Sequence, residues 1–272
     1  MDPELFPQRH EMADPSMVRN LAAQAEAIWP QERPLLERYG LSGPTRILDG
    51  GCGTGEITGR LAALFPDASV LGVDILDGHL DLARQRHAAL APRVLFEHRS
   101  LFELGLPARS FDLVVCRHVL QSIPHPERAL AELLRVARPG ARLHLIAEDY
   151  GMIHLPRGRL DPEEMWSAVP ARFAEADGID MFIGRNVFGH LRRLGVRDVT
   201  VDYVAVDTLR VPRETFAAIW EAWRDGYTAT AALRLGKGEA EVRAMFDDQI
   251  ATIRDPDRFA VWLVPVVSAR VP

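Results

Sequence analysis

Short apolar segments alternate with amphipathic segments through the first half of the chain. Apolar strands are predicted at 45–49, 69–74, 93–97, 111–116 and 142–147. Helices with one apolar face are predicted between them, at 56–65, 78–90 and 126–137. Strands that alternate with helices of this length form βαβ units and a mainly parallel sheet. The carboxyl ends of such strands meet at one edge, which is where ligands bind in α/β proteins.

A long helix is predicted before this alternating region. Apolar residues recur at helical spacing over 16–38, and Ser16 is the expected N-cap. Pro30 or Pro34 is expected to kink or break the helix, because proline has no N–H to donate and its ring clashes with the preceding turn.

The second half of the chain is less regular. We expect a loop with a short helix at 151–183, a helix at 185–194, a strand at 197–206, helices at 213–225 and 239–254, and a strand at 258–269. The expected organisation is a helical cover over 1–40, a core over 41–206 with a substrate segment at 151–183, a helical insertion over 207–257, and a last core strand over 258–272.

Composition excludes several classes of protein. The 272 residues carry a formal net charge of -6, and the arginines are scattered, which disfavours a nucleic-acid partner. The two cysteines, Cys52 and Cys116, form neither a disulfide framework nor a zinc motif. The N-terminal segment has no apolar region typical of a signal peptide, and no apolar run reaches the roughly 18 residues of a spanning helix. We therefore expect a cytoplasmic protein without a membrane partner.

The segment Leu48–Glu56, LDGGCGTGE, follows a strand and opens a helix. Glycines there let a ligand approach the main chain closely. A dinucleotide fingerprint needs a small residue where Glu56 stands, and a glutamate would add negative charge beside a phosphate. S-adenosylmethionine (SAM) carries no phosphate, and its charged amino group suits an acid such as Asp49. The loop therefore favours SAM over a nicotinamide cofactor.

Four motifs in the chain occur in the order and spacing of a known family. They are LDGGCGTG, SVLGVDI, SFDLVVC and LLRVARPGARLHLI, and together they span about 45–150. On these motifs the sequence resembles the class I SAM-dependent methyltransferases. The resemblance implies an α/β, Rossmann-like, mostly parallel seven-stranded sheet with helices on both faces, an N-terminal helical cover and a helical insertion between the last two strands. It also implies SAM as cofactor and S-adenosylhomocysteine as product.

The resemblance assigns cofactor-binding roles to matching positions. Asp74 would take both ribose hydroxyls, although it is also a candidate turn or capping residue beside Asp77, the expected cap of the 78–90 helix. Ser100 stands where the family usually has an aspartate that contacts the adenine, so the main chain of the next two residues would serve instead. The cofactor-binding candidates are Asp49, Gly51, Cys52, Gly53, Asp74, Ile75, Ser100, Leu101, Phe102, Cys116 and Arg117.

Methyl transfer from a sulfonium depends mainly on positioning, and a base is needed only when the acceptor must lose a proton. His118 is the first candidate because its loop should face the methyl group and histidine titrates near neutrality. Its alternative role is simply to pack beside the cofactor. The other candidates follow the fifth strand, and they are Asp149, Tyr150, His154 and Glu148. These residues lack the spacing of a metal site, so no metal is expected.

The predicted function is methylation at O, N or C of a small, aromatic or apolar metabolite, with residues 151–183 contacting that acceptor. An RNA or protein methyltransferase and a SAM-binding protein with other chemistry, such as a cyclase, are the alternatives. A nicotinamide oxidoreductase is disfavoured by Glu56. The aromatic stripe at 216–223 is expected to be core, and a homodimer is left open.

Overall fold

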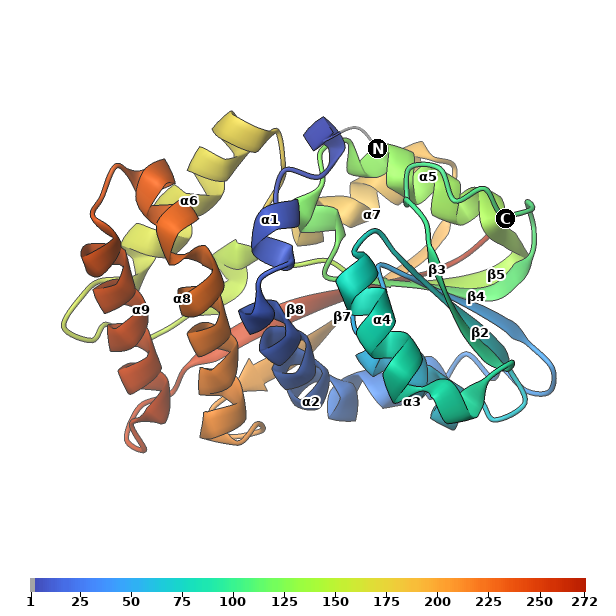
Figure 1. The fold of residues 1–272 in the computed structure, drawn as a ribbon, viewed down its shortest axis with the longest axis horizontal. Helices are drawn as coiled ribbons and strands as arrows, with labels where there is room; N and C mark the ends of the chain where they lie inside the picture. The colour runs from blue at the N-terminus through green and yellow to red at the C-terminus, as the bar shows by residue number, and fades with distance from the viewer. Residues whose placement is uncertain (1–2) are drawn as a thin grey trace.

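A computed structural model describes residues 3–272 of the chain, and Figure 1 shows their arrangement. The strands are β1 (Arg46–Gly50), β2 (Ser69–Asp74), β3 (Val94–His98), β4 (Phe111–Arg117), β5 (Ala137–Ile146), β6 (Ile153–His154), β7 (Asp198–Asp207) and β8 (Val261–Arg270). The helices are α1 (Arg9–Met12), α2 (Pro15–Glu37), α3 (Glu56–Leu64), α4 (Asp77–Arg86), α5 (Pro126–Val136), α6 (Pro162–Asp177), α7 (Ile183–Arg193), α8 (Arg213–Leu235) and α9 (Glu239–Arg254).

Within the described residues the strands form one sheet of eight, in the order β3-β2-β1-β4-β5-β8-β6, with β7 also pairing β8. The first five strands are parallel to one another, and β8 runs antiparallel to its three neighbours. The predicted mainly parallel α/β sheet is thus confirmed. The predicted count of seven strands was one short. The additional strand is the two-residue β6, which pairs with Val261 and Trp262 of β8, beyond the part of β8 that pairs with β5.

Helices cover both faces of the sheet, as the apolar strands require. On one face α2, α3 and α4 pack on β1–β3 through residues such as Leu36, Leu61 and Leu80. On the other face α5 and α7 pack through residues such as Leu133 and Leu191. The carboxyl edge of the parallel strands therefore lies open between the two layers.

The helices α6, α8 and α9 form a separate group, drawn on the left in Figure 1, and we call them the helical group. Their core contains Trp220 and Trp262, both fully buried, and it extends to the face of α2 that carries Ile28. The predicted core role of the stripe that includes Phe216 and Trp220 is confirmed by this burial. The short helix α1 lies between the helical group and the parallel strands (Figure 1).

Several local predictions were wrong. The break predicted at Pro30 or Pro34 is wrong, since α2 runs through both prolines and burial of its apolar residues against both cores outweighs the lost hydrogen bonds, whereas the alternative of a kink stays a prediction. Its N-cap is Asp14, whose carboxylate accepts from the Ser16 N–H, so Ser16 is inside the helix. Asp77 is the first residue of α4 and Leu76 stands at its N-cap, without a side-chain cap.

The segment 151–183 was also misjudged. Where a loop with a short helix was expected, α6 has 16 residues and begins after Asp161, whose side chain accepts from the Glu163 N–H. Likewise α8 extends to Leu235, ten residues beyond the predicted end at 225. Both helices are completed by packing in the helical group, which local periodicity does not reveal.

Candidate functional site

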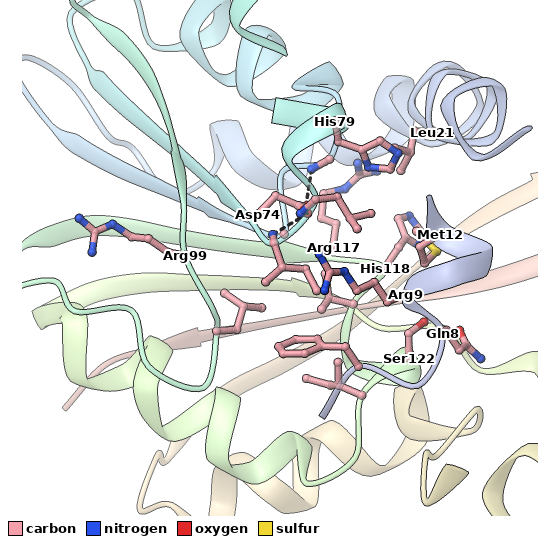
Figure 2. A pocket seen from close by; sticks show the side chains of 18 residues that line it. Gln8, Arg9, Met12, Leu21, Asp74, His79, Arg99, Arg117, His118 and Ser122 are labelled. Atoms are coloured by element: carbon pink, nitrogen blue, oxygen red, sulfur yellow. Dashed lines mark hydrogen bonds between the residues drawn. The ribbon is translucent and has the colours of Figure 1, made fainter. Parts of the chain in front are cut away.

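A pocket of about 780 Å³, including space open to solvent, lies at the carboxyl edge of the parallel strands. We call it the edge pocket. Figure 2 shows its walls, which come from the loops after β1, β2, β3 and β4 and from α1. Of the predicted site residues, the pocket brings together Gly51, Gly53, Asp74, Ile75, Leu101, Arg117 and His118.

The glycine loop presents main chain to the edge pocket. Gly51, Gly53 and Gly55 have φ of 75°, 51° and 77°, a region that glycine enters at little cost. A Cβ at Gly51 would lie 2.3 Å from Cγ2 of Val119, so no side chain fits there. The N–H groups of Gly51 and Cys52 donate to the carbonyl oxygen of Val73, at 2.8 and 3.0 Å, which fixes the loop against β2.

Asp74 ends β2 and lies beside this loop. Its Oδ2 accepts from the Gly53 N–H at 2.8 Å, and its Oδ1 accepts from the N–H groups of Ile75 at 2.8 Å and Leu76 at 3.0 Å (dashed in Figure 2). A carboxylate has about four acceptor positions, so one remains for a ligand in the pocket. Asp74 is therefore a turn residue and a pocket residue at once.

A smaller recess adjoins the edge pocket and is lined by Asp49, Cys52, Arg117 and others. We call it the inner recess. Asp49 is buried and accepts from the Thr58 hydroxyl at 2.6 Å. Burial is the main cause that raises the pKa of Asp49, to about 6. A cation entering the recess would meet a carboxylate that water does not shield.

Arg117 carries positive charge to the same recess. Its side chain is only 7% exposed, and its Nε lies 3.0 Å from Oε1 of Glu32, which projects from α2. Its buried Nε and Nη2 have no hydrogen bond among the described residues, so Nε meets Glu32 as an ion pair while Nη2 has no partner. Burial alone would raise the pKa of Glu32, but Arg117 and the hydrogen bond from His144 outweigh it, so this carboxyl is held below its ordinary value. The guanidinium thus keeps one donor free for an anionic group.

His118 has a strained backbone, with φ of 55°, and its N–H donates to the carbonyl oxygen of Ile146 at 2.8 Å. Such strain in a non-glycine residue persists where surrounding contacts enforce it, often at functional sites. Its Nδ1 lies 2.9 Å from Oε1 of Glu148, whereas its buried Nε2 has no partner among residues 3–272. A carboxylate can only accept, so the Nδ1–H of His118 donates to Glu148, and in this tautomer Nε2 carries the free lone pair.

Other predicted residues lie elsewhere. Ser100 and Phe102 are outside the lining of the edge pocket, and the Ser100 hydroxyl accepts from the Phe102 N–H at 3.1 Å. Cys116 is fully buried, and burial raises the pKa of its thiol and that of Cys52, so both thiols stay protonated near neutral pH.

Three of the four secondary candidates for the base are not brought to the edge pocket, whereas the fourth, Glu148, contacts His118. Asp149 is buried and receives two hydrogen bonds from Arg185, at 2.5 and 2.6 Å. His154 is an exposed residue of β6. Tyr150 lines a different cavity. Their place after the fifth strand suggested proximity, but that part of the chain turns toward the helical group.

A helical cover over 1–40 was predicted, but the residues in its first turns that line the edge pocket were not identified from the sequence. Phe6, Gln8, Arg9 and Met12 line the edge pocket, and Figure 2 places the last three opposite His118. The only signal was the presence of Phe6 and Met12 in an otherwise polar segment. The partnership of Glu148 with His118 was also missed, because it depends on the register of β4 and β5, which places Arg117 opposite Ile146.

The chain resembles known proteins mainly in its own first half. A family model described as a methyltransferase domain matches residues 47–140. Trans-aconitate 2-methyltransferase of Methylobacterium nodulans is 39% identical over 109 residues, which are 40% of this chain and 40% of that protein. Ubiquinone biosynthesis O-methyltransferase of Hahella chejuensis is 32% identical over 137 residues, 45% of this chain and 56% of that protein. The chain spans 36% to 56% of the length of such curated relatives.

Solved structures share the fold over most of the chain. Haemonchus contortus phosphoethanolamine N-methyltransferase 2, solved with SAM, covers 90% of this chain with a TM-score of 0.57 and 20% identity, and 53% of that chain is matched. The cyclase SpnF covers 89% of this chain with a TM-score of 0.55 and 23% identity, and 81% of that chain is matched. At these identities the likeness concerns the fold. No helix of residues 3–272 combines the length and apolar character needed to cross a bilayer.

Proposed function

Because residues 47–140 form a class I SAM-dependent methyltransferase domain, we propose that the protein transfers a methyl group from SAM to a small molecule. One observation carries the proposal, namely the union of the glycine loop with Asp74 in the wall of the edge pocket. The main-chain groups of the glycine loop and the carboxylate of Asp74 suit a nucleoside with a zwitterionic tail. The inner recess offers a negative charge from Asp49 and a positive charge from Arg117 to that tail.

The residues fit SAM in two parts. Asp74 would accept from one ribose hydroxyl at its remaining acceptor position, and Ile75 and Leu101 would pack on the adenine. The ammonium group would pair with Asp49, and the carboxylate would pair with the free donor of Arg117, because charge-assisted hydrogen bonds are the strong ones. When bound, SAM supplies a methyl group already activated by its sulfonium.

His118 would act as the general base where the acceptor carries a proton. Glu148 holds Nδ1, so the free Nε2 faces the proton to be removed. General-base catalysis of this kind contributes about 10²–10⁴-fold in rate. Glu148 is a positioning residue, since it acts through the histidine ring.

The test is isothermal titration calorimetry with SAM on the wild type, Asp74→Ala and Asp77→Ala. Asp77 is the matched control, because its side chain is 70% exposed and pairs only with His98 at the surface. We expect about a 100-fold loss of affinity in Asp74→Ala, since each hydrogen bond to a charged group contributes about 1.5–3 kcal/mol. Unchanged affinity in Asp74→Ala with an intact melting curve, or no SAM binding by the wild type, would reject the proposal.

A second measurement separates the kinds of acceptor. Labelled methyl is followed from SAM into small metabolites, RNA and protein. We expect label in small molecules alone, because the chain is acidic and lacks a basic platform for nucleic acid. Binding of SAM without transfer to any pool would instead favour the alternative of a SAM-binding protein with other chemistry. The cytoplasmic location and the homodimer stay predictions.

A further inference from the structure

A second cavity, of about 440 Å³ with its open mouth included, lies within the helical group. We call it the aromatic cavity. Its walls come from Gln8, Tyr150, α6, α8 and α9, and include Trp166, Trp223 and Tyr227. Tyr150 stacks on Trp166 with ring centres 5.5 Å apart and planes 16° from parallel. Such an apolar enclosure with a few polar groups is typical of a small-molecule site.

The described residues that line the aromatic cavity carry no formal charge. The indole N–H groups of Trp166 and Trp220 both donate to Oε1 of Gln249, at 3.0 and 2.8 Å, so these polar atoms are satisfied within the wall. Burial raises the pKa of Tyr150 and of Tyr227, which keeps both phenols neutral. An anionic guest would therefore lose its hydration without gaining a partner in the lining, and a cation would find only ring faces there.

The aromatic cavity adjoins the reactive end of the edge pocket. Gln8 lines both spaces, and Met12 lines the edge pocket. The hydroxyl of Tyr227 lies 3.3 Å from Oε1 of Gln8 and 3.5 Å from Sδ of Met12. The two spaces are thus separated by side chains of one short segment, not by a strand or a long helix.

Glu148 lies next to one residue of each space, His118 of the edge pocket and Tyr150 of the aromatic cavity. Its carboxylate lies 2.9 Å from Nδ1 of His118, and it is the charged neighbour that adds to burial in raising the pKa of Tyr150. It also accepts from the Gln24 amide at 3.3 Å. Both contacts fall on Oε1, and Glu148 does not line the aromatic cavity, so the lining itself offers an ammonium group no carboxylate.

We propose that the aromatic cavity is the methyl-acceptor site and that it selects an uncharged, ring-containing molecule whose hydroxyl reaches past Gln8 to His118. This proposal rests on the proposed methyltransferase function. In the transfer, the hydroxyl oxygen forms the new bond to the methyl carbon as the carbon–sulfur bond breaks toward sulfur, and Nε2 of His118 takes the hydroxyl proton. A phenolic acceptor in this apolar environment loses its proton with difficulty, because burial disfavours the charged phenolate. A base such as His118 is therefore needed to remove the proton.

Three probes of similar ring size but different charge test the selection on the wild type. They are 1-naphthol, 1-naphthoate and 1-naphthylmethyl-trimethylammonium, each titrated in the presence of S-adenosylhomocysteine while tryptophan fluorescence is followed. We expect 1-naphthol to bind at least about tenfold more tightly than either ion. Equal or tighter binding of the carboxylate would overturn the proposal, and so would equal or tighter binding of the ammonium, because aromatic cages also bind such cations.

Blocking variants locate the binding. Val169→Phe and Met181→Phe each add volume to the lining, and Ala171→Phe adds a ring to the exposed side of α6 as the matched control. We expect the first two to weaken 1-naphthol binding about tenfold or more, with the control unchanged and SAM affinity within about twofold in all three. Unchanged 1-naphthol affinity in both folded blocking variants would overturn the proposal even if SAM still binds. If the wild-type protein does not bind SAM at all, the proposed methyltransferase function itself is rejected.

Discussion

The edge pocket and the aromatic cavity are built in different ways from different parts of the chain. In the edge pocket, positive-φ glycines and strand-end carboxylates stand within short motifs such as Leu48–Glu56. The aromatic cavity takes its walls from six stretches between Gln8 and Phe246, and all of them lie outside 47–140. The proposed cofactor half of the site is thus specified locally, whereas the proposed acceptor half depends on how distant helices pack. That difference explains why the sequence motifs indicate the family but do not predict the identity of the methyl acceptor.

The largest effect is expected where the two spaces meet. Replacing His118 with alanine removes the base and should lower kcat by about 10²–10⁴-fold for a hydroxyl acceptor. Affinity for S-adenosylhomocysteine should change little, because Asp74 and the glycine loop remain. The control is His125→Ala, a histidine whose side chain is 62% exposed. Single-turnover kinetics that match the wild type would assign His118 a packing role only.

A smaller effect is expected from the geometry of the glycine loop. Gly51→Ala forces a side chain at φ of 75° and against Val119, so we expect a loss of about 1–3 kcal/mol in unfolding free energy and weaker SAM binding. Gly78→Ala is the control, since Gly78 lies in α4 with nothing within 4 Å of its added Cβ, and it should raise stability slightly. Urea unfolding of both variants measures the difference, and equal stability would show that the loop tolerates a side chain.

The pH dependence of SAM affinity sharpens the role of the inner recess. Burial raises the pKa of Asp49 to about 6, so its carboxyl is neutral below that pH and anionic above it. The ammonium group of SAM favours the anion, so affinity should rise about tenfold from pH 5 to pH 7 and then level off. Calorimetry at several pH values measures this rise. In Asp49→Asn it should disappear, and a rise that persists there would assign the titration to another group.

The smallest effect concerns α2, which packs on the helical group and on α3. Asp14→Ala removes its N-cap and should lower stability by about 1 kcal/mol, or about 2–4 °C in Tm. Because α2 borders both halves, 1-naphthol and SAM affinities should fall together by less than about threefold. A loss confined to one ligand in this variant would indicate that the two halves respond independently.

The sequence allowed prediction of the features that depend on short stretches of chain. The five parallel strands, the glycine loop and the placement of Asp74 beside it follow from local apolar runs and spacing. Features set by distant contacts escaped, including the full length of α6 and the continuity of α2 through its prolines. The contact between His118 and Glu148 joins residues that follow two different strands, β4 and β5, so the sequence around either residue did not predict it.

Glu32 limits how a ligand can leave the protein. This fully buried carboxylate ties α2 to Arg117 and to His144 at 3.0 Å each, and lifting the helix would leave opposite charges stranded in an apolar interior. By contrast, none of the four residues of α1 is buried. We therefore expect a ligand to enter and leave by displacement of α1 while α2 stays in place. The residence time of a bound ligand should then respond to changes at Gln8 or Met12 far more than to changes along the outer face of α2.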